Sequence, residues 1–125
     1  MRTQPGYYRH PTLHGETVVF VCEDDLWAVD AAGGVARRLT ANPGRITFPS
    51  FSPDGKQILF TGQDEGPNEA YVMPADGGTP KRLTWLGSIL QTVGWHPDGT
   101  RPIFASDWRE GRRGLVPLGD SVLAG

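Results

Sequence analysis

The string FSPDG at residues 51–55 returns as WHPDG at residues 95–99, and the string GGVARRLT at 33–40 returns as GGTPKRLT at 77–84. Both returns are displaced by 44 residues. Two unrelated strings that share one displacement indicate an internal repeat. A period of about 40 to 45 residues is typical of the four-stranded blade of a β-propeller. The sequence therefore predicts successive copies of one antiparallel sheet unit.

The segments between these strings are short, rich in β-branched and aromatic residues, and bounded by Gly, Pro and Asp, without the 3.6-residue pattern of a helix. The turn residues Pro53, Asp54 and Gly55 suit a tight connection between two strands. One copy is complete and two are partial. The predicted strands are 17–21, 26–29 and 36–39 in the first copy, 46–51, 57–61, 69–73 and 81–85 in the second, and 90–95 and 103–105 in the third.

The predicted fold class is all-β, an incomplete β-propeller of about two and a half four-stranded antiparallel repeats. The repeat pattern stops after Ser106, where a charged and glycine-rich segment begins. Each blade needs neighbours on both faces, so we expect a fragment of a larger propeller, or several copies that join. The predicted division is a lead-in at 1–15, the last three strands of blade 1 at 16–45, a complete blade 2 at 46–89, the first two strands of blade 3 at 90–106, and an irregular tail at 107–125.

Composition and charge exclude several classes of partner. The 125 residues include 17 Gly and 11 Pro and only 38% hydrophobic residues, which suits many short strands joined by turns. A net charge of −2 gives no field that favours nucleic acid or an anionic membrane. Cys22 is the single cysteine, so no internal disulfide forms, and no apolar signal-peptide core follows Met1. We expect a cytoplasmic protein without cofactors.

Nucleophilic catalysis is not predicted for this chain. The string GDSVL at 119–123 comes closest to a nucleophile elbow, but it lacks the second glycine, so Ser121 is not assigned as a nucleophile. Three histidines are possible bases: His10, His14 and His96. Because His14 and His96 occupy or adjoin turn positions of the repeat, turn roles are favoured over catalytic ones.

The remaining candidates also have structural interpretations. The acidic strings Glu23-Asp24-Asp25 and Asp64-Glu65 lack the ligand spacing of a calcium loop, and no zinc-ligand pattern is present, so we expect them to cap or solvate loops. Cys22 is expected to pack as a small hydrophobic residue. Trp27, Trp85 and Trp95 are expected to pack between blades, and Arg109, Arg112 and Arg113 to form a solvated tail. The sequence therefore predicts no catalytic, cofactor-binding or metal-binding residue in this chain.

The string DDLW at 24–27, the paired glycine strings that end in Arg-Leu-Thr, the SPDG turn and the string WLG at 85–87 together resemble the start of the N-terminal six-bladed propeller of tricorn-type proteases. The lead-in YRHP at 8–11 with His14-Gly15 is also similar, and the resemblance covers about residues 7–106. It implies a cytoplasmic, homo-oligomeric serine peptidase that trims oligopeptides, with its catalytic residues in later domains. Only scaffold positions match here, among them Asp25, Leu26 and Trp27.

Three functions stay open at this stage. The first is a non-catalytic propeller segment that guides substrate or supports an oligomer, with peptides or a protein as partner. The second is a stand-alone interaction module, because TolB-like propellers share the Pro-Asp-Gly turn. The third is a peptidase in its own right.

Overall fold

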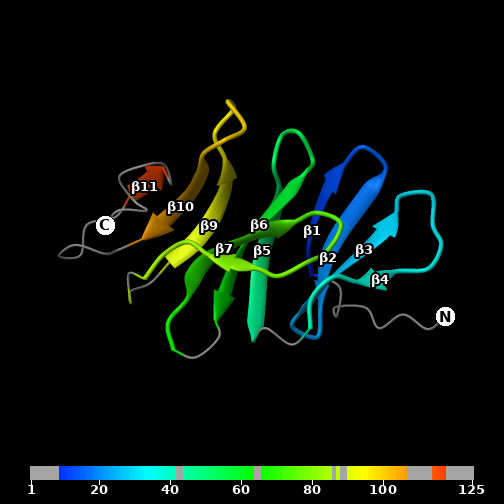
Figure 1. The fold of residues 1–125 in the computed structure, drawn as a ribbon, viewed down its shortest axis with the longest axis horizontal. Coiled ribbons are helices and arrows are strands. Elements are labelled where there is room, and N and C mark those ends of the chain that lie inside the picture. Colours follow the sequence, from blue (N-terminus) through cyan, green and yellow to red (C-terminus); the bar gives the residue numbers. More distant parts are fainter. Residues whose placement is uncertain are drawn as a thin grey trace.

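The protein consists of three antiparallel β-sheets that lie side by side in one row (Figure 1). The structure is a computed structural model that describes residues 9–41, 44–63, 66–85, 87, 90–106 and 114–117. Within these ranges every regular element is a strand. None of the described residues forms a helix long and apolar enough to cross a membrane. The all-β propeller-blade class predicted from the sequence is confirmed.

Chain order and spatial order agree within each sheet, because every strand pairs with its sequence neighbour. We name the sheets 1, 2 and 3 in chain order; in Figure 1 they run from the blue end to the orange end of the row. Sheet 1 contains β1 (Arg9–His14), β2 (Thr17–Cys22), β3 (Asp25–Asp30) and β4 (Arg37–Arg38). Sheet 2 contains β5 (Arg45–Phe51), β6 (Gln57–Gln63), β7 (Glu69–Pro74) and β8 (Lys81–Arg82). Sheet 3 contains β9 (Leu90–Trp95), β10 (Pro102–Ser106) and β11 (Gly114–Pro117).

The strands extend beyond those that the sequence predicts. Sheet 1 has a fourth strand, β1, within the predicted lead-in, and sheet 3 gains β11 within the segment predicted to be irregular. β1 escaped the pattern because its pairing shifts register between Arg9 and Thr12, which breaks the two-residue alternation. The fourth strands β4 and β8 are shorter than predicted, with two residues each. The boundaries of the repeat units themselves stay a prediction.

Sheet 2 is packed on both faces, and the two-residue alternation of β6 is the reason. Ile58 and Phe60 join the cluster that fills the space between sheets 1 and 2, whereas Leu59 joins the cluster between sheets 2 and 3. Successive side chains of a strand point to opposite faces, so one strand supplies both cores. All three side chains are at most 1% exposed. Each junction between sheets is therefore a separate hydrophobic core.

Candidate functional site

The first strands of the three sheets, β1, β5 and β9, pack next to one another. They form what we call the first-strand surface, a shallow hollow of about 310 Å³. Its described residues are His10, Pro11, Phe48, Pro49, Gln91, Thr92 and Val93. This surface combines apolar, aromatic and hydrogen-bonding groups, which are the groups that a peptide side chain contacts.

A repeated irregularity shapes the first-strand surface. His10 in β1 and Phe48 in β5 both have positive φ, 52° and 55°, and each precedes a proline at a point where the strand pairing shifts register. The two rings lie 4.5 Å apart between centroids. Positive φ is uncommon for residues other than glycine, so its recurrence at the same place in two sheets indicates a feature of the repeat. The shift re-aims both rings toward the same hollow.

Hydrogen bonds join the three first strands across the sheet junctions. The hydroxyl of Thr92 donates to the Phe48 carbonyl at 3.1 Å, and the indole N–H of Trp95 donates to the Ser50 carbonyl at 3.0 Å. The Phe51 amide donates to the hydroxyl of Thr12 at 3.3 Å. These bonds fix neighbouring strands at one spacing, so the surface is preorganised.

A larger hollow of about 870 Å³ opens between sheets 1 and 2 beside His10 and Phe48. Its walls include both signs of charge, Glu23 and Asp24 from the β2–β3 turn and Arg45 from the start of β5. Mixed charge of this kind suits the backbone of a peptide better than a polyanion. No group of three or more metal-ligating side chains occurs among the described residues.

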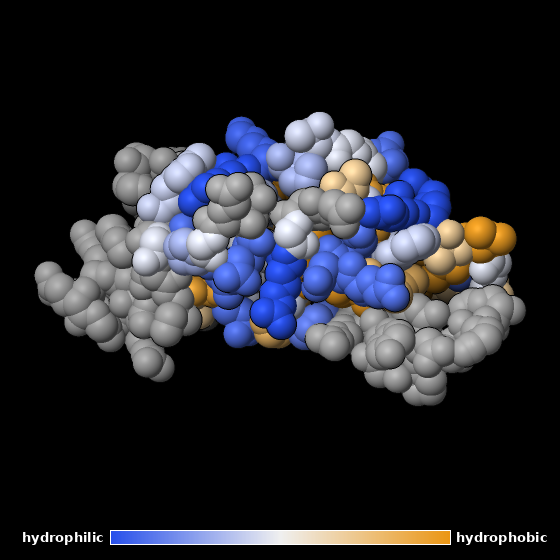
Figure 2. Space-filling model, turned by 90° about the horizontal axis from the view of Figure 1, so that it is seen from below, coloured by the Kyte–Doolittle hydropathy of each residue, from blue (hydrophilic) through white to orange (hydrophobic). Residues whose placement is uncertain are grey.

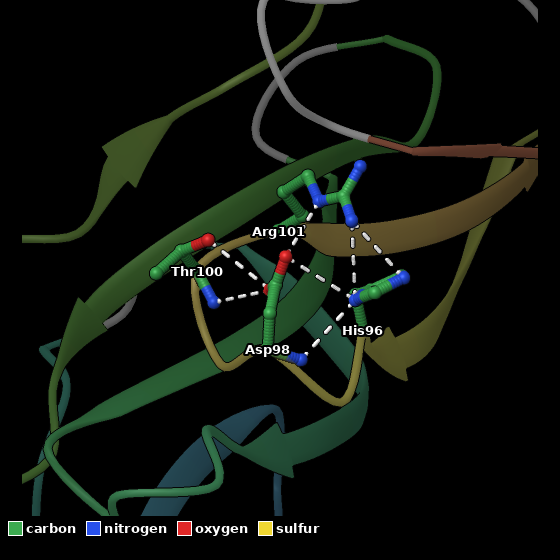
Figure 3. Close-up of polar contacts among 4 residues, drawn as sticks. All are labelled: His96, Asp98, Thr100 and Arg101. Atoms are coloured by element: carbon green, nitrogen blue, oxygen red, sulfur yellow. Dashed lines mark hydrogen bonds and ion pairs between the residues drawn. The ribbon is translucent and has the colours of Figure 1, made fainter.

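The turns between first and second strands form polar networks. In sheet 3, the Asp98 carboxylate accepts the Thr100 amide at 2.9 Å and the Nε–H of Arg101 at 2.9 Å, while the Asp98 amide donates to His96 Nδ1 (Figure 3). The Thr100 amide, followed by Arg101, lowers the pKa of Asp98 to about 2. Hydrogen bonds that favour the charged form explain this direction.

The same turn in sheet 2 contacts sheet 1. Hydrogen bonding from the Lys56 amide, and then from Ser52, lowers the pKa of Asp54. His14 Nε2 lies 3.1 Å from the Pro53 carbonyl oxygen. Gly55 has φ +76°, and a Cβ there would lie 2.3 Å from His14 Nδ1. The glycine of this turn is therefore required both for its backbone conformation and for the approach of His14.

In each of sheets 1 and 2, a buried cluster of polar side chains, which we call the latch, joins the end of the sheet to its third strand. In sheet 1, the hydroxyl of Thr40 donates to Asp25 at 2.6 Å and accepts the Leu26 amide, while Arg38 pairs with Asp25 at 2.9 Å. In sheet 2, Thr84, Glu69 and Arg82 repeat the arrangement. The Arg-Leu-Thr strings thus hold the end of each sheet to its third strand. These pairs are not predicted from the sequence, although both carboxylates precede their threonines by 15 residues.

The structure places the predicted residues as follows. His14 is the last residue of β1, next to the β1–β2 turn, and His96 lies between β9 and β10, whereas His10 lies on the first-strand surface. Asp25 is buried in a latch instead of solvating a loop. Cys22 is partly buried, and burial followed by the nearby Glu23 raises the pKa of its thiol. Ser121, Asp64, Glu65, Arg109, Arg112 and Arg113 lie outside the described residues.

The tryptophans behave differently from one another. Trp27 and Trp95 are partly buried. Trp95 packs against the core between sheets 2 and 3. Trp85 is 65% exposed and lies under the Arg82 guanidinium, 5.2 Å from the ring centroid. The prediction that Trp85 packs between blades is therefore wrong, because its strand ends at Arg82 and releases the ring to solvent.

Comparison with known proteins places this arrangement among propellers of one kind. The chain is 44% identical over 96 residues to tricorn protease homolog 1 of Streptomyces coelicolor, which covers 76% of this chain and 9% of that protein. A crystal structure of the tricorn protease superposes with a TM-score of 0.76 at 27% identity, over 92% of this chain and 13% of that one. TolB from Acinetobacter baumannii gives 0.74 at 28% identity, over 88% and 29%.

The matched segment is thus a small part of longer proteins in these relatives, about a tenth of the length of the Streptomyces homolog. The sequence model described as the tricorn protease N-terminal beta propeller domain matches residues 5–116, which include every strand of the three sheets except the last residue of β11. The chain belongs to the family of the tricorn protease N-terminal β-propeller domain.

Proposed function

We propose that this chain is a non-catalytic propeller segment of a tricorn-type serine peptidase, in which it forms part of a wall that guides oligopeptides. One observation carries the proposal: the first-strand surface brings Phe48, Val93 and His10 from three sheets into one hollow. Phe48 and Val93 are exposed large hydrophobic residues on that surface. Exposed apolar groups flanked by Gln91 and Thr92 suit transient contact with peptide side chains.

Membership of the tricorn propeller family supports this role, because the relatives carry far more chain than the matched segment. We propose in addition that this chain contributes no catalytic, cofactor-binding or metal-binding residue, and that the catalytic residues of such a peptidase lie in later domains. The unpaired Cys22 and the family resemblance support a cytoplasmic location.

Fluorescence anisotropy with labelled oligopeptides tests the guiding role. The chain should bind them weakly, and Phe48→Ala should raise the Kd about tenfold, equivalent to about 1.4 kcal/mol. Thr79→Ala is the control, because Thr79 is exposed in the turn between β7 and β8, away from this surface. Equal affinities of both variants for every peptide would contradict the proposal. Fluorogenic peptides should show no turnover, and serine-reagent-sensitive cleavage would contradict the non-catalytic assignment.

A second candidate is an interaction module, favoured by the likeness to TolB over 88% of this chain. Such a module would retain a folded protein partner through the loops between its strands, and it would bind unstructured oligopeptides no better than the Phe48→Ala variant does. Competition between a captured protein and labelled peptides separates the two candidates.

A further inference from the structure

The hollow of about 870 Å³ between sheets 1 and 2, which we call the inter-sheet hollow, lies at one end of the strands. β1 and β5 begin at this end, and β2 and β6 finish there, at the lower side of Figure 1. Figure 2 looks onto this side of the molecule, and hydrophilic residues predominate over the middle of the row. Val21 and Ile46 of the hydrophobic core also line the hollow. The inter-sheet hollow therefore combines a polar opening with an apolar part.

Two carboxylates of sheet 1 line the inter-sheet hollow. Glu23 and Asp24 form the whole connection between β2, which ends at Cys22, and β3, which begins at Asp25. Both have positive φ, 52° and 66°. A two-residue connection of this kind is best suited by Asn-Gly, so turn geometry does not account for the glutamate. Because the turn is so short, it holds both carboxylates beside the hollow.

The charges of the inter-sheet hollow are not neutralised by ion pairs within the described part of the chain. Asp25, the next residue after the turn, pairs with Arg38 at 2.9 Å, whereas Glu23 and Asp24 take part in no such pair there. Arg45, which lines the hollow from sheet 2, is also outside the ion pairs of the described residues. At pH 7, with histidine neutral, two carboxylates against one guanidinium leave a net negative charge. The hollow therefore favours a cationic group.

The inter-sheet hollow adjoins the first-strand surface. The rings of His10 and Phe48, 4.5 Å apart between centroids, line both. Gln63 lies in the wall of the hollow and donates its Nε2–H to the Gly66 carbonyl at 2.8 Å, which orients an amide that can bond a peptide backbone. A peptide with an apolar side chain on the first-strand surface would thus place a neighbouring residue in the inter-sheet hollow.

We propose that the inter-sheet hollow selects oligopeptides that carry a positive charge next to an apolar residue. Glu23 and Asp24 bind an ammonium group of the peptide, either its N-terminus or a lysine side chain. Arg45 donates to a carbonyl of the peptide backbone, and the apolar residue occupies the first-strand surface beside Phe48. This inference rests on the proposed guiding role and adds to it the class of peptide that is guided.

Fluorescence anisotropy with four C-terminally labelled hexapeptides tests the proposal. Each peptide contains one phenylalanine among alanines, its N-terminus is free or acetylated, and the residue before the phenylalanine is lysine or norleucine. The peptide that lacks both ammonium groups should bind about fivefold more weakly than the tighter of the two singly charged peptides, as expected for exposed ion pairs. Loss of affinity on acetylation identifies the terminus as the bound group, and loss on replacing lysine identifies the side chain.

Substitutions in the hollow should change this charge preference, which is the ratio of the Kd of the neutral peptide to that of the charged one. Glu23→Gln and Asp24→Asn keep the size of each side chain, and the double variant should abolish the preference. Arg45→Gln should act in the opposite direction and increase the preference about twofold. Glu16→Gln is the matched control and should leave it unchanged, because Glu16 is exposed in the β1–β2 turn at the opposite end of β2.

Equal dissociation constants for all four peptides would overturn the inference. An equal loss of preference in Glu16→Gln and Glu23→Gln would also overturn it, because the preference would then reflect net charge and not the hollow. If Phe48→Ala weakens the binding of every peptide while peptide charge has no effect, this inference fails and the guiding role stands. If the charge preference is intact but Phe48→Ala binds all four peptides as tightly as the unmodified chain, the guiding surface fails and cation binding by the hollow stands. A chain that binds none of the peptides overturns both.

Discussion

The hydroxyl of Thr84 donates to the buried carboxylate of Glu69, and Thr40 stands in the same relation to Asp25 one repeat earlier. In each pair the threonine also accepts the amide that follows the carboxylate residue. A single hydroxyl thus satisfies two buried groups. This geometry explains why the strings GGVARRLT and GGTPKRLT both end in threonine.

The first prediction concerns this hydroxyl. Thr84→Val keeps the shape of the side chain but removes a donor to Glu69 and the acceptor for the Ala70 amide. We expect the free energy of unfolding to fall by about 1–3 kcal/mol, because buried polar groups lose hydrogen bonds. Urea denaturation measures the change. Thr79→Val, at an exposed turn position, should change it by less than about 0.5 kcal/mol, and equal effects of the two variants would contradict the latch.

The second prediction concerns the turn glycines. Gly55 has a positive φ, and an added Cβ there would clash with His14. Gly15 also has a positive φ, +60°, but nothing lies within 4 Å of a Cβ added there, so Gly15→Ala changes the backbone preference alone. In both variants the backbone conformation should lower the free energy of unfolding by about 1 kcal/mol. In Gly55→Ala the steric conflict with His14 should lower it by about 1 kcal/mol more. Thermal and urea unfolding measure both. The double variant His14→Ala/Gly55→Ala should show less than the sum of its single losses, and simple additivity would argue against the contact.

The third prediction concerns pH. The pKa of Asp98 is lowered to about 2, so its charged form is favoured in the folded state. Stability from this group is complete above its unfolded pKa of about 3.9 and is lost as the pH falls through about 2. Carbon-detected NMR titration of the Asp98 carboxyl should give a midpoint near 2. Arg101→Gln should move that midpoint upward, and a midpoint near 3.9 in the unmodified chain would disprove the network of Figure 3.

The fourth prediction concerns the junction between sheets 2 and 3. Trp95→Phe retains an aromatic ring but removes the indole N–H that donates to the Ser50 carbonyl. We expect a loss of about 0.5–1.5 kcal/mol in the free energy of unfolding. Trp85→Phe is the matched control, since the Trp85 ring is exposed and lies under the Arg82 guanidinium. If both substitutions lower the free energy of unfolding by the same amount, the hydrogen bond from Trp95 to Ser50 contributes nothing to stability.

The repeat predicts the fold because short local patterns of sequence are enough to reveal it. Turns such as 53–55 and the strings at 33–40 and 77–84 are short, and their common displacement places the sheets in order. β1 could not be found in this way, because the register shift after Arg9 and the positive φ of His10 interrupt the alternation of its side chains. The burial of Asp25 was missed for another reason: its partner Thr40 lies 15 residues away, across a hairpin whose geometry the sequence does not display.

The first-strand surface was likewise beyond the sequence analysis. The sequence marks His10 only as a possible base, whereas the structure places its ring against Phe48. That contact depends on how sheet 1 packs against sheet 2, which no single segment encodes. The exposure of Trp85 has a simpler cause, since β8 ends at Arg82 and not at the ring. Local pattern thus predicted which strands form, and packing between sheets decided which side chains meet.

The prolines that follow His10 and Phe48 affect the tendency of the protein to aggregate in concentrated solution. Strands β1 and β5 are edges of their sheets, and an unprotected edge is a template onto which foreign strands can polymerise. Pro11 and Pro49 remove one amide donor each, at the point where the pairing is already out of step. An incoming strand would therefore lack a hydrogen-bond donor at these two positions. This disfavours fibril growth but leaves the edges accessible to smaller molecules.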